Sequence, residues 1–183
     1  MLKKNIFIVL LLLFWVRTQA QEDNSVFQFL KLPFSSHAAA LGGENISIIE
    51  DDLTMAVHNP ALLSCVADKT LNLNYTLYIA GVNTASAAFS RVLGDRSTWA
   101  VTAQFVNYGT MKETTSENII TGTFSAKDMA FSGIYSYDLS DYWSGGVKAN
   151  LIYSNYDKFS SFAIGVDLSL IHISEPTRLA LIS

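Results

Sequence analysis

Between residues 143 and 154, apolar and polar side chains alternate with a period of two, and this stretch constrains the fold more than any other. One row consists of Trp143, Gly145, Val147, Ala149, Leu151 and Tyr153. The other consists of Ser144, Gly146, Lys148, Asn150, Ile152 and Ser154. This period is typical of a β-strand whose two faces meet different environments. Aromatic residues at both ends and a polar second row match a strand that crosses a bilayer.

The same alternation recurs along the chain and predicts six or seven strands. It is clear at residues 71–79, 99–106, 129–137 and 161–167, and weaker at 84–93. Short turns separate most of these segments, which predicts antiparallel neighbours. The polar residues 108–118 predict a loop outside the membrane, and residues 119–125 either a short strand or part of that loop.

The pattern predicts an all-β fold, an antiparallel outer-membrane β-barrel of which this chain holds about half the strands. Charged residues gather in the predicted turns and loops. Lys148 is expected to face the lumen, because a lysine facing lipid at mid-depth costs about 2–4 kcal/mol. A secreted soluble β-sandwich would also alternate and is the alternative fold.

Residues 1–20 have the parts of a signal peptide. Lys3 and Lys4 precede an apolar core at residues 6–16, and the small-residue site Thr18-Gln19-Ala20 follows. The core is too short to span a bilayer, which needs about 20 residues. We therefore expect export, and since no later segment predicts a transmembrane helix, a membrane-embedded mature chain must be a barrel.

The mature part is acidic and carries no recognisable chemistry. Residues 21–167 hold eight Lys and Arg against fifteen Asp and Glu, a net charge of −7, which argues against nucleic-acid binding. Cys65 is alone, and His37 and His58 lack a metal-ligand spacing. No phosphate loop, dinucleotide fingerprint, nucleophile elbow or HExxH motif occurs. We expect no enzyme activity, no cofactor and no metal.

Residues 21–69 differ from the strands that follow and are expected to form a plug or to close the periplasmic end of the barrel. Residues 45–49 alternate briefly and predict a short strand. Asp51 or Asp52 can cap a helical turn that carries Leu53, Ala56 and Val57 on one side. The turn should end by His58 because Asn59 precedes Pro60, and a second apolar helical turn should follow.

Four motifs in this segment resemble the PorV/PorQ family of the type IX secretion system of Bacteroidetes, and its PorQ-type members most. They are FLKLP at 29–33, AAALGG at 38–43, DD at 51–52 and NPALL at 59–63. The family-motif residues are Pro33, Gly42, Gly43, Asp51, Asp52, Asn59, Pro60 and Ala61. NYG at 107–109, GTFSA at 122–126 and KD at 127–128 also resemble the family.

The resemblance covers residues 29–167 and extends more broadly to FadL-like outer-membrane transporters. It implies a FadL-type barrel in the cell outer membrane, in contact with outer-membrane lipid and with other type IX secretion components or cargo proteins. In FadL-like proteins the N-terminal segment packs inside the barrel, which implies a plug here. The alternatives are a FadL-like channel for the uptake of hydrophobic small molecules and a secreted soluble β-domain.

The C-terminal residues 168–183 are not expected to belong to the natural protein. Residues 168–178 read LSLIHISEPTR, which is the translation of a transposon adapter used to prepare sequencing libraries. The barrel is therefore expected to be truncated at Asp167. Six or seven strands are too few to close a barrel of FadL width, so we do not expect this polypeptide alone to insert stably.

Overall fold

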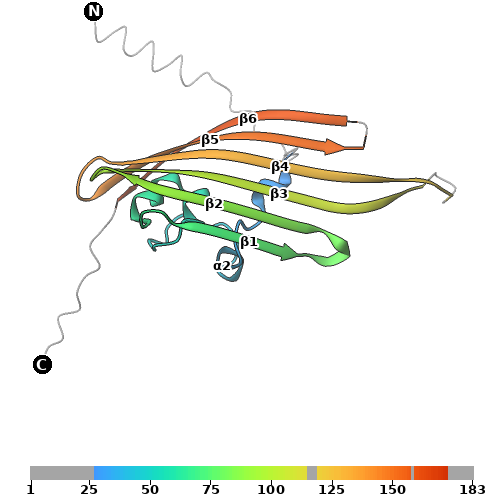
Figure 1. Cartoon of the computed structure of the whole chain (residues 1–183), viewed down its shortest axis with the longest axis horizontal. Coiled ribbons are helices and arrows are strands. Elements are labelled where there is room, and N and C mark those ends of the chain that lie inside the picture. Colours follow the sequence, from blue (N-terminus) through green and yellow to red (C-terminus); the bar gives the residue numbers. More distant parts are fainter. Residues whose placement is uncertain (1–26, 115–118, 158, 173–183) are drawn as a thin grey trace, which may run out of the picture.

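The six strands form one antiparallel sheet in which every strand pairs with its neighbours in the sequence. This computed structural model describes residues 27–114, 119–157 and 159–172. Figure 1 shows the strands side by side, with the segment that precedes them lying against one face. The predicted all-β class and the antiparallel order are confirmed. The predicted signal peptide and residues 173–183 lie outside the described residues.

The strands lengthen toward the middle of the sheet. They are β1 (Leu71–Leu77), β2 (Asn83–Leu93), β3 (Ser97–Thr114), β4 (Ile120–Asp138), β5 (Trp143–Tyr156) and β6 (Phe159–His172). A single 3-10 turn, η4 (Ile79–Gly81), joins β1 to β2. The last five residues of β6 fall in the stretch expected to be foreign, and they pair with β5 because their alternation continues.

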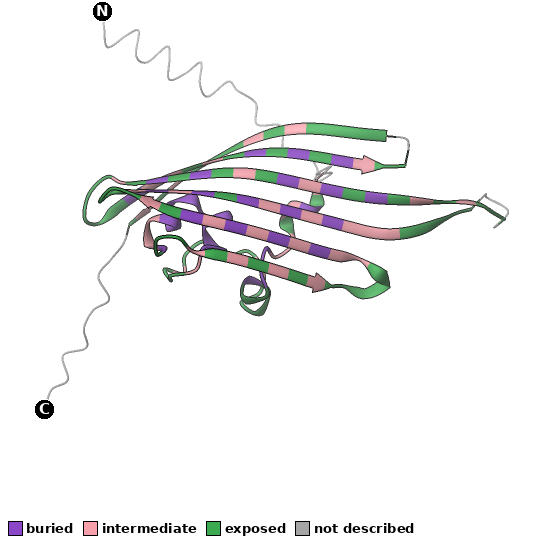
Figure 2. Cartoon of the chain, viewed as in Figure 1, coloured by how far each residue is buried: buried purple, intermediate pink, exposed green. Residues whose placement is uncertain are grey.

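The two faces of the sheet have opposite composition, and the polar one is covered. Thr84, Ser86, Thr102, Gln104 and Asn150 point to the covered face and are buried. On the other face, large apolar side chains are exposed, as in Phe131 at 56% and Ile164 at 68%. Figure 2 shows buried and exposed residues alternating along each central strand. We call the covered side the inner face and the apolar side the outer face.

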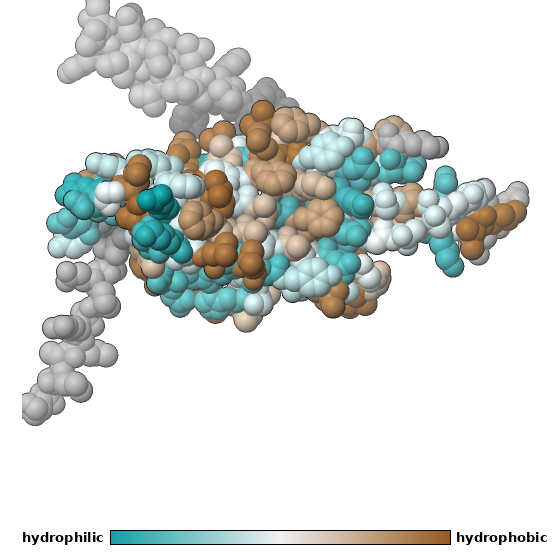
Figure 3. All heavy atoms as spheres, viewed as in Figure 1, coloured by the Kyte–Doolittle hydropathy of each residue, from teal (hydrophilic) through white to brown (hydrophobic). Residues whose placement is uncertain are grey.

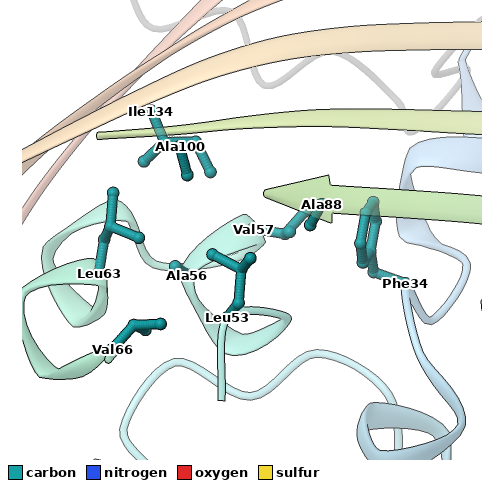
Figure 4. Packing of buried hydrophobic residues seen from close by; sticks show 9 residues of the cluster. All are labelled: Phe34, Leu53, Ala56, Val57, Leu63, Val66, Ala88, Ala100 and Ile134. Atoms are coloured by element: carbon teal, nitrogen blue, oxygen red, sulfur yellow. The ribbon is translucent and has the colours of Figure 1, made fainter. Parts of the chain in front are cut away.

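The segment before β1 consists of short helical turns. They are η1 (Gln28–Lys31), α2 (Ser36–Ala40), η2 (Met55–Val57) and η3 (Pro60–Cys65). Leu53, Ala56 and Val57 share one hydrophobic cluster, as predicted. The cluster continues across the inner face through Ala88 of β2, Ala100 of β3 and Ile134 of β4 (Figure 4). We call residues 27–69 the N-terminal segment.

Two predicted elements are wrong. Residues 45–49 form no strand, because the Asn45 side chain accepts hydrogen bonds from the backbone amides of Ser47 (3.3 Å) and Ile48 (3.2 Å) and closes a turn. The loop expected at 108–118 is wrong for residues 108–114, which extend β3 to Thr114, while residues 115–118 lie outside the described residues. Of the two alternatives for residues 119–125, the strand is found, since residues 120–125 belong to β4. The weak strand expected at residues 84–93 is confirmed as β2.

None of the helices among the described residues is long and apolar enough to cross a membrane.

Candidate functional site

The family-motif residues gather in the N-terminal segment, where they shape its turns and attach it to the inner face. Gly42 and Gly43 follow α2 with positive φ angles of 99° and 108°. Their backbone amides donate to the carbonyls of Ala39 (3.2 Å) and Ala38 (2.8 Å), which ends the helix as a Schellman motif. Pro33 follows η1, and Leu32 before it is extended, as the residue before a proline usually is.

Asp51 and Asp52 stabilise the conformation of the N-terminal segment through hydrogen bonds to Ala67 and Thr54. Asp51 accepts from the Ala67 amide at 2.7 Å, and Asp52 accepts from the amide and hydroxyl of Thr54, each at 2.8 Å. The bonds of Asp52 close a turn directly before η2, whose own N-cap residue is Thr54 and makes no side-chain cap hydrogen bond. His37 Nδ1 lies 2.6 Å from Asp52 Oδ2 and Nε2 lies 3.8 Å from Glu50, so His37 joins α2 to this loop.

The ionisation of this pair follows from its contacts. The hydrogen bond to Asp52 raises the pKa of His37 above its ordinary value. Desolvation acts on Asp52 in the opposite sense, yet the hydrogen bonds from His37 and Thr54 leave its pKa lowered. Burial and the charge of Lys148 lower the pKa of His58. The two histidines of the segment therefore respond to pH in opposite directions.

Asn59, Pro60 and Ala61 bring the segment into backbone contact with β5. The Asn59 side chain caps η3 by accepting from the Ala61 amide (3.2 Å), and it donates to the Ile46 carbonyl (2.7 Å). Ala61 is fully buried. A Cβ placed on Gly146 would lie 2.6 Å from the Pro60 carbonyl oxygen, so only glycine permits this approach. The sequence signal for Gly146 was a glycine inside an otherwise regular strand.

Two polar contacts also attach the segment to β5 and to β2. Lys148 of β5 is on the inner face, and its Nζ donates to the Val57 carbonyl at 2.7 Å. Ser86 of β2 donates to the Phe34 carbonyl at 2.5 Å. Both contacts are to backbone carbonyls, so they fix the position of the segment independently of its side chains.

A cavity of about 330 Å³ lies between the segment and the inner face. Its lining combines apolar side chains such as Phe34 and Ile152 with Lys148, His58 and Asp167. Asp167 accepts from the Asn150 amide group (2.8 Å), whose oxygen accepts from Ser132 (2.6 Å). Among the described residues, no group of three or more His, Cys, Asp or Glu side chains could hold a metal ion.

A second polar cluster lies on the inner face near the other end of the sheet. The hydroxyls of Tyr108 (2.7 Å) and Tyr156 (2.8 Å) both donate to Asp128 Oδ2, and Asp128 is 1% exposed. This cluster joins β3, β4 and β5. The sequence pattern does not predict it, because the polarity around residue 108 predicts a loop and the alternation of the next strand begins only at residue 129.

The outer face is an extended apolar surface of the described strands and carries almost no charge. Figure 3 shows hydrophobic side chains gathered over the strands, with hydrophilic ones toward the ends. Over the part of the sheet where β3 and β4 are flanked by β2 and β5, its charged side chains are Arg91 and Lys127. Arg91 pairs with Trp99 near one end, and Lys127 pairs with Asn107 near the other. A central region free of charge separates them.

No protein-family model matches this chain, and neither does any curated protein. The fold itself assigns the chain to the all-β class, with a six-stranded antiparallel sheet and almost no helix.

Proposed function

We propose that the chain is the first half of an outer-membrane β-barrel whose N-terminal segment plugs the lumen. The observation that carries this proposal is the reversed polarity of the sheet: small polar residues are buried and large apolar residues are exposed. A soluble sandwich buries its apolar rows instead. Exposed apolar surface of this extent is stable in hydrocarbon and unfavourable in water.

The dimensions of the apolar face support the proposal. Trp143 and Tyr153 lie at the two ends of the apolar row of β5, ten residues apart. At about 3.3 Å per residue and a tilt of about 40°, this distance spans about 25 Å of membrane thickness. That value matches the apolar band of bacterial outer-membrane barrels. The short turns at residues 94–96 and 139–142 would then lie on the periplasmic side, and the β3–β4 hairpin would be extracellular.

We further propose that the protein is a component of the type IX secretion system that acts through protein–protein contacts in the export or surface attachment of cargo. The motif residues support this role, since they build the plug and its contact with Gly146. A plugged lumen leaves little space for solute passage, so the work falls to the surfaces outside the membrane. No enzyme activity, cofactor or nucleic-acid partner forms part of the proposal.

Deletion of the full-length native gene tests this role. Cargo proteins should disappear from the medium and cell surface and accumulate in the periplasm, while outer-membrane permeability is unchanged. Re-expression of the gene should restore secretion. Normal secretion in the deletion strain would contradict the proposal.

The cavity favours a second candidate, a FadL-like channel for hydrophobic small molecules. It combines apolar walls with the Lys148 ammonium group, a combination that suits an amphipathic molecule. The same deletion strain distinguishes the two roles. Loss of growth on a hydrophobic nutrient with secretion intact would support uptake.

A further inference from the structure

The outer face is hollowed where β1, β2, β3 and β4 lie side by side. Two adjoining hollows have volumes of about 440 and 210 Å³, and Ala87, Ala103 and Phe131 line both of them. The outward side chains that line them belong to the hydrophobic surface over the strands in Figure 3. The two hollows form one apolar depression on the face that the proposed barrel turns toward lipid. We call it the outer furrow.

The furrow exists because two small side chains lie between two large ones. In one line across the sheet, Leu73 of β1 pairs with Ala87 of β2, Ala87 with Ala103 of β3, and Ala103 with Phe131 of β4. Leu73 is 69% exposed and Phe131 is 56% exposed, so both stand above the alanine methyl groups. The alanines therefore form the floor of the furrow, and the large side chains form its walls.

The furrow runs along β2 toward the end of the sheet at the β2–β3 turn. On the outer row of β2, Ala85 and Ala87 are followed by Phe89 and then by Arg91. Ala85 and Arg91 are six residues apart, which corresponds to about 20 Å along the strand. At a tilt of about 40°, this length spans about 15 Å of membrane thickness. The hydrocarbon core of a bilayer is about 30 Å thick, so this distance matches one leaflet.

A cation closes this end of the furrow. Arg91 is exposed, and no carboxylate among the described residues lies within ion-pair distance of its guanidinium group. Arg91 pairs with Trp99 of β3, whose ring packs edge-on against Phe89 with the ring centres 6.2 Å apart. Tryptophan is enriched at membrane–water interfaces, at the level of the lipid headgroups. Arg91 therefore lies at a depth where it can bind a lipid phosphate.

A second cation lies beside Arg91. Two hydrogen bonds hold the chain before β1 against β2 on either side of this residue, from the Ser90 amide to the Thr70 carbonyl (3.0 Å) and from the Val92 amide to the Asp68 carboxylate (2.9 Å). Lys69 lies between these two bonds, and its side chain is 71% exposed. Its ammonium group is 3.9 Å from Asp68, a weak contact at an exposed site. Both cations favour a negatively charged headgroup at this end.

We propose that the outer furrow binds one glycerophospholipid of the periplasmic leaflet. One acyl chain lies along Ala85 and Ala87, and the phosphate group binds the Arg91 guanidinium, whose parallel N–H donors fit two phosphate oxygens. The inference rests on the proposed function, since only a chain embedded in the outer membrane presents this face to lipid. The apolar floor takes a hydrocarbon chain, the cation takes the phosphate, and the distance between them matches one leaflet.

The test measures phospholipid binding to the full-length native protein in detergent by native mass spectrometry, with dioleoyl phosphatidylglycerol as the added probe. The wild-type protein should retain one phospholipid. Ala87→Phe fills the furrow and should weaken binding about tenfold. Ala149→Phe is the matched control, because it adds the same side chain to the outer face of β5, outside the furrow, and should bind as the wild type does. Equal binding by the two variants would overturn the proposal.

A second pair of variants tests the phosphate contact and leaves the furrow intact. Arg91→Gln should weaken binding about tenfold, because it removes a charged hydrogen-bond donor. Lys127→Gln removes the other outer-face cation, at the opposite end of the sheet, and should leave binding unchanged. Arg91 is exposed at the end of the furrow, so Arg91→Gln covers a failure of Ala87→Phe to fold. Unchanged binding by Arg91→Gln, or displacement of the probe by inorganic phosphate or by lipopolysaccharide, would overturn the proposal.

Heat-modifiable migration in detergent separates this inference from the proposed function. A wild-type protein that forms a heat-modifiable barrel and retains no phospholipid would overturn the inference alone. A wild-type protein that stays in solution without detergent would overturn the proposed function and the inference with it. A dimer in the same spectra that Ala87→Phe abolishes and Arg91→Gln preserves would assign the furrow to a second copy of the chain and overturn the lipid.

Discussion

At the scale of single residues, Gly146 shows how the sheet and the N-terminal segment depend on each other. The Pro60–Ala61 peptide lies directly against the Gly146 Cα, and a Cβ there would lie 2.6 Å from the Pro60 oxygen. This close contact is between backbones, so no side-chain rotation can relieve an added methyl group. The contact therefore requires both a glycine in β5 and the rigid Asn59–Pro60 turn.

We predict that Gly146→Ala displaces the segment from the inner face, at a cost of about 1–3 kcal/mol. Gly133→Ala is the matched control, because a Cβ at Gly133 would meet nothing within 4 Å. Cys65, the only cysteine of this sequence, reports the displacement. Burial raises the pKa of the Cys65 thiol, so this thiol should react slowly with maleimide in the native protein and in Gly133→Ala. It should react faster in Gly146→Ala. Equal labelling rates for the two variants would contradict the prediction.

The two histidines predict opposite pH dependences for docking of the segment. The pKa of His37 is raised above 6.5, so its stabilisation is complete below pH 6.5 and is lost as the pH rises through the raised value. Asp52, with a pKa below its ordinary 3.8, adds stability above that pH and loses it as the pH falls further. The pair is therefore most stabilising between pH 3.8 and 6.5.

His58 acts in the other direction. Its pKa is lowered below 6.5, so the undocked segment binds a proton more readily, and docking weakens as the pH falls below 6.5. His37→Gln should leave the segment better protected at pH 8 than at pH 5.5, and His58→Gln should leave it less protected at pH 8. Hydrogen exchange of the η2 and η3 amides, corrected for the intrinsic rate, measures both effects. Identical pH profiles for the two variants would exclude this assignment.

At the scale of elements, each central strand presents one row to the segment and the other to the outside. Val101 of β3 lies on the outer face and is 49% exposed. In water, an arginine at such a position would change stability by less than about 0.5 kcal/mol. In a bilayer, the same change costs about 2–4 kcal/mol near the midplane. One substitution therefore separates the membrane and soluble interpretations.

We predict that Val101→Arg lowers the amount of assembled protein in the outer membrane and its resistance to urea. Thr110→Arg is the control, since it adds the same side chain to β3 beyond the part of this strand that pairs with β2. This variant should assemble normally. If Val101→Arg also assembles normally and unfolds at the same urea concentration, the outer face does not contact lipid.

Polarity alone does not distinguish a strand from a loop in the β3–β4 hairpin. Residues 108–114 are polar, and polarity predicted a loop. Outside a bilayer, however, both faces of a strand meet water, so a polar sequence is compatible with a strand as well as with a loop. Thr110, Thr114, Thr121 and Thr123 are β-branched and favour the strand. Cross-strand pairing, such as that of Met111 with Phe124, decided between them.

At the scale of the whole molecule, the described sheet has two edge strands, each paired on one side only. Within the described residues, β1 pairs only with β2, and β6 pairs only with β5. Unpaired backbone groups cannot remain in hydrocarbon. The proposed barrel therefore requires further strands that connect β6 back to β1 in the full-length native protein.

We predict that the full-length native protein migrates faster in detergent gels before heating than after it, because a closed barrel stays compact until heat opens it. It should also remain in the membrane pellet after washing with sodium carbonate. Mobility that does not depend on heating, together with release by carbonate, would favour a secreted soluble domain.

The sequence by itself determined the strands and the direction in which their side chains point. A period of two is a local property of extended backbone, so the neighbours of Lys148 alone place it on the same row as Ser144 and Asn150, the row that the structure covers. The hydrogen bonds of Asp52 and Asn59 are equally local, because each side chain accepts from an amide two residues ahead.

Only the tertiary structure decided which surfaces meet. The contact of Pro60 with Gly146, the bond from Lys148 to Val57 and the Tyr108–Asp128–Tyr156 cluster join residues between 20 and 91 positions apart, and no local pattern encodes them. The length of β3 and β4 was likewise fixed by pairing across the hairpin. Alternation depends only on neighbouring residues. Docking of the N-terminal segment and the register of the strands depend instead on contacts between residues that are distant in the sequence.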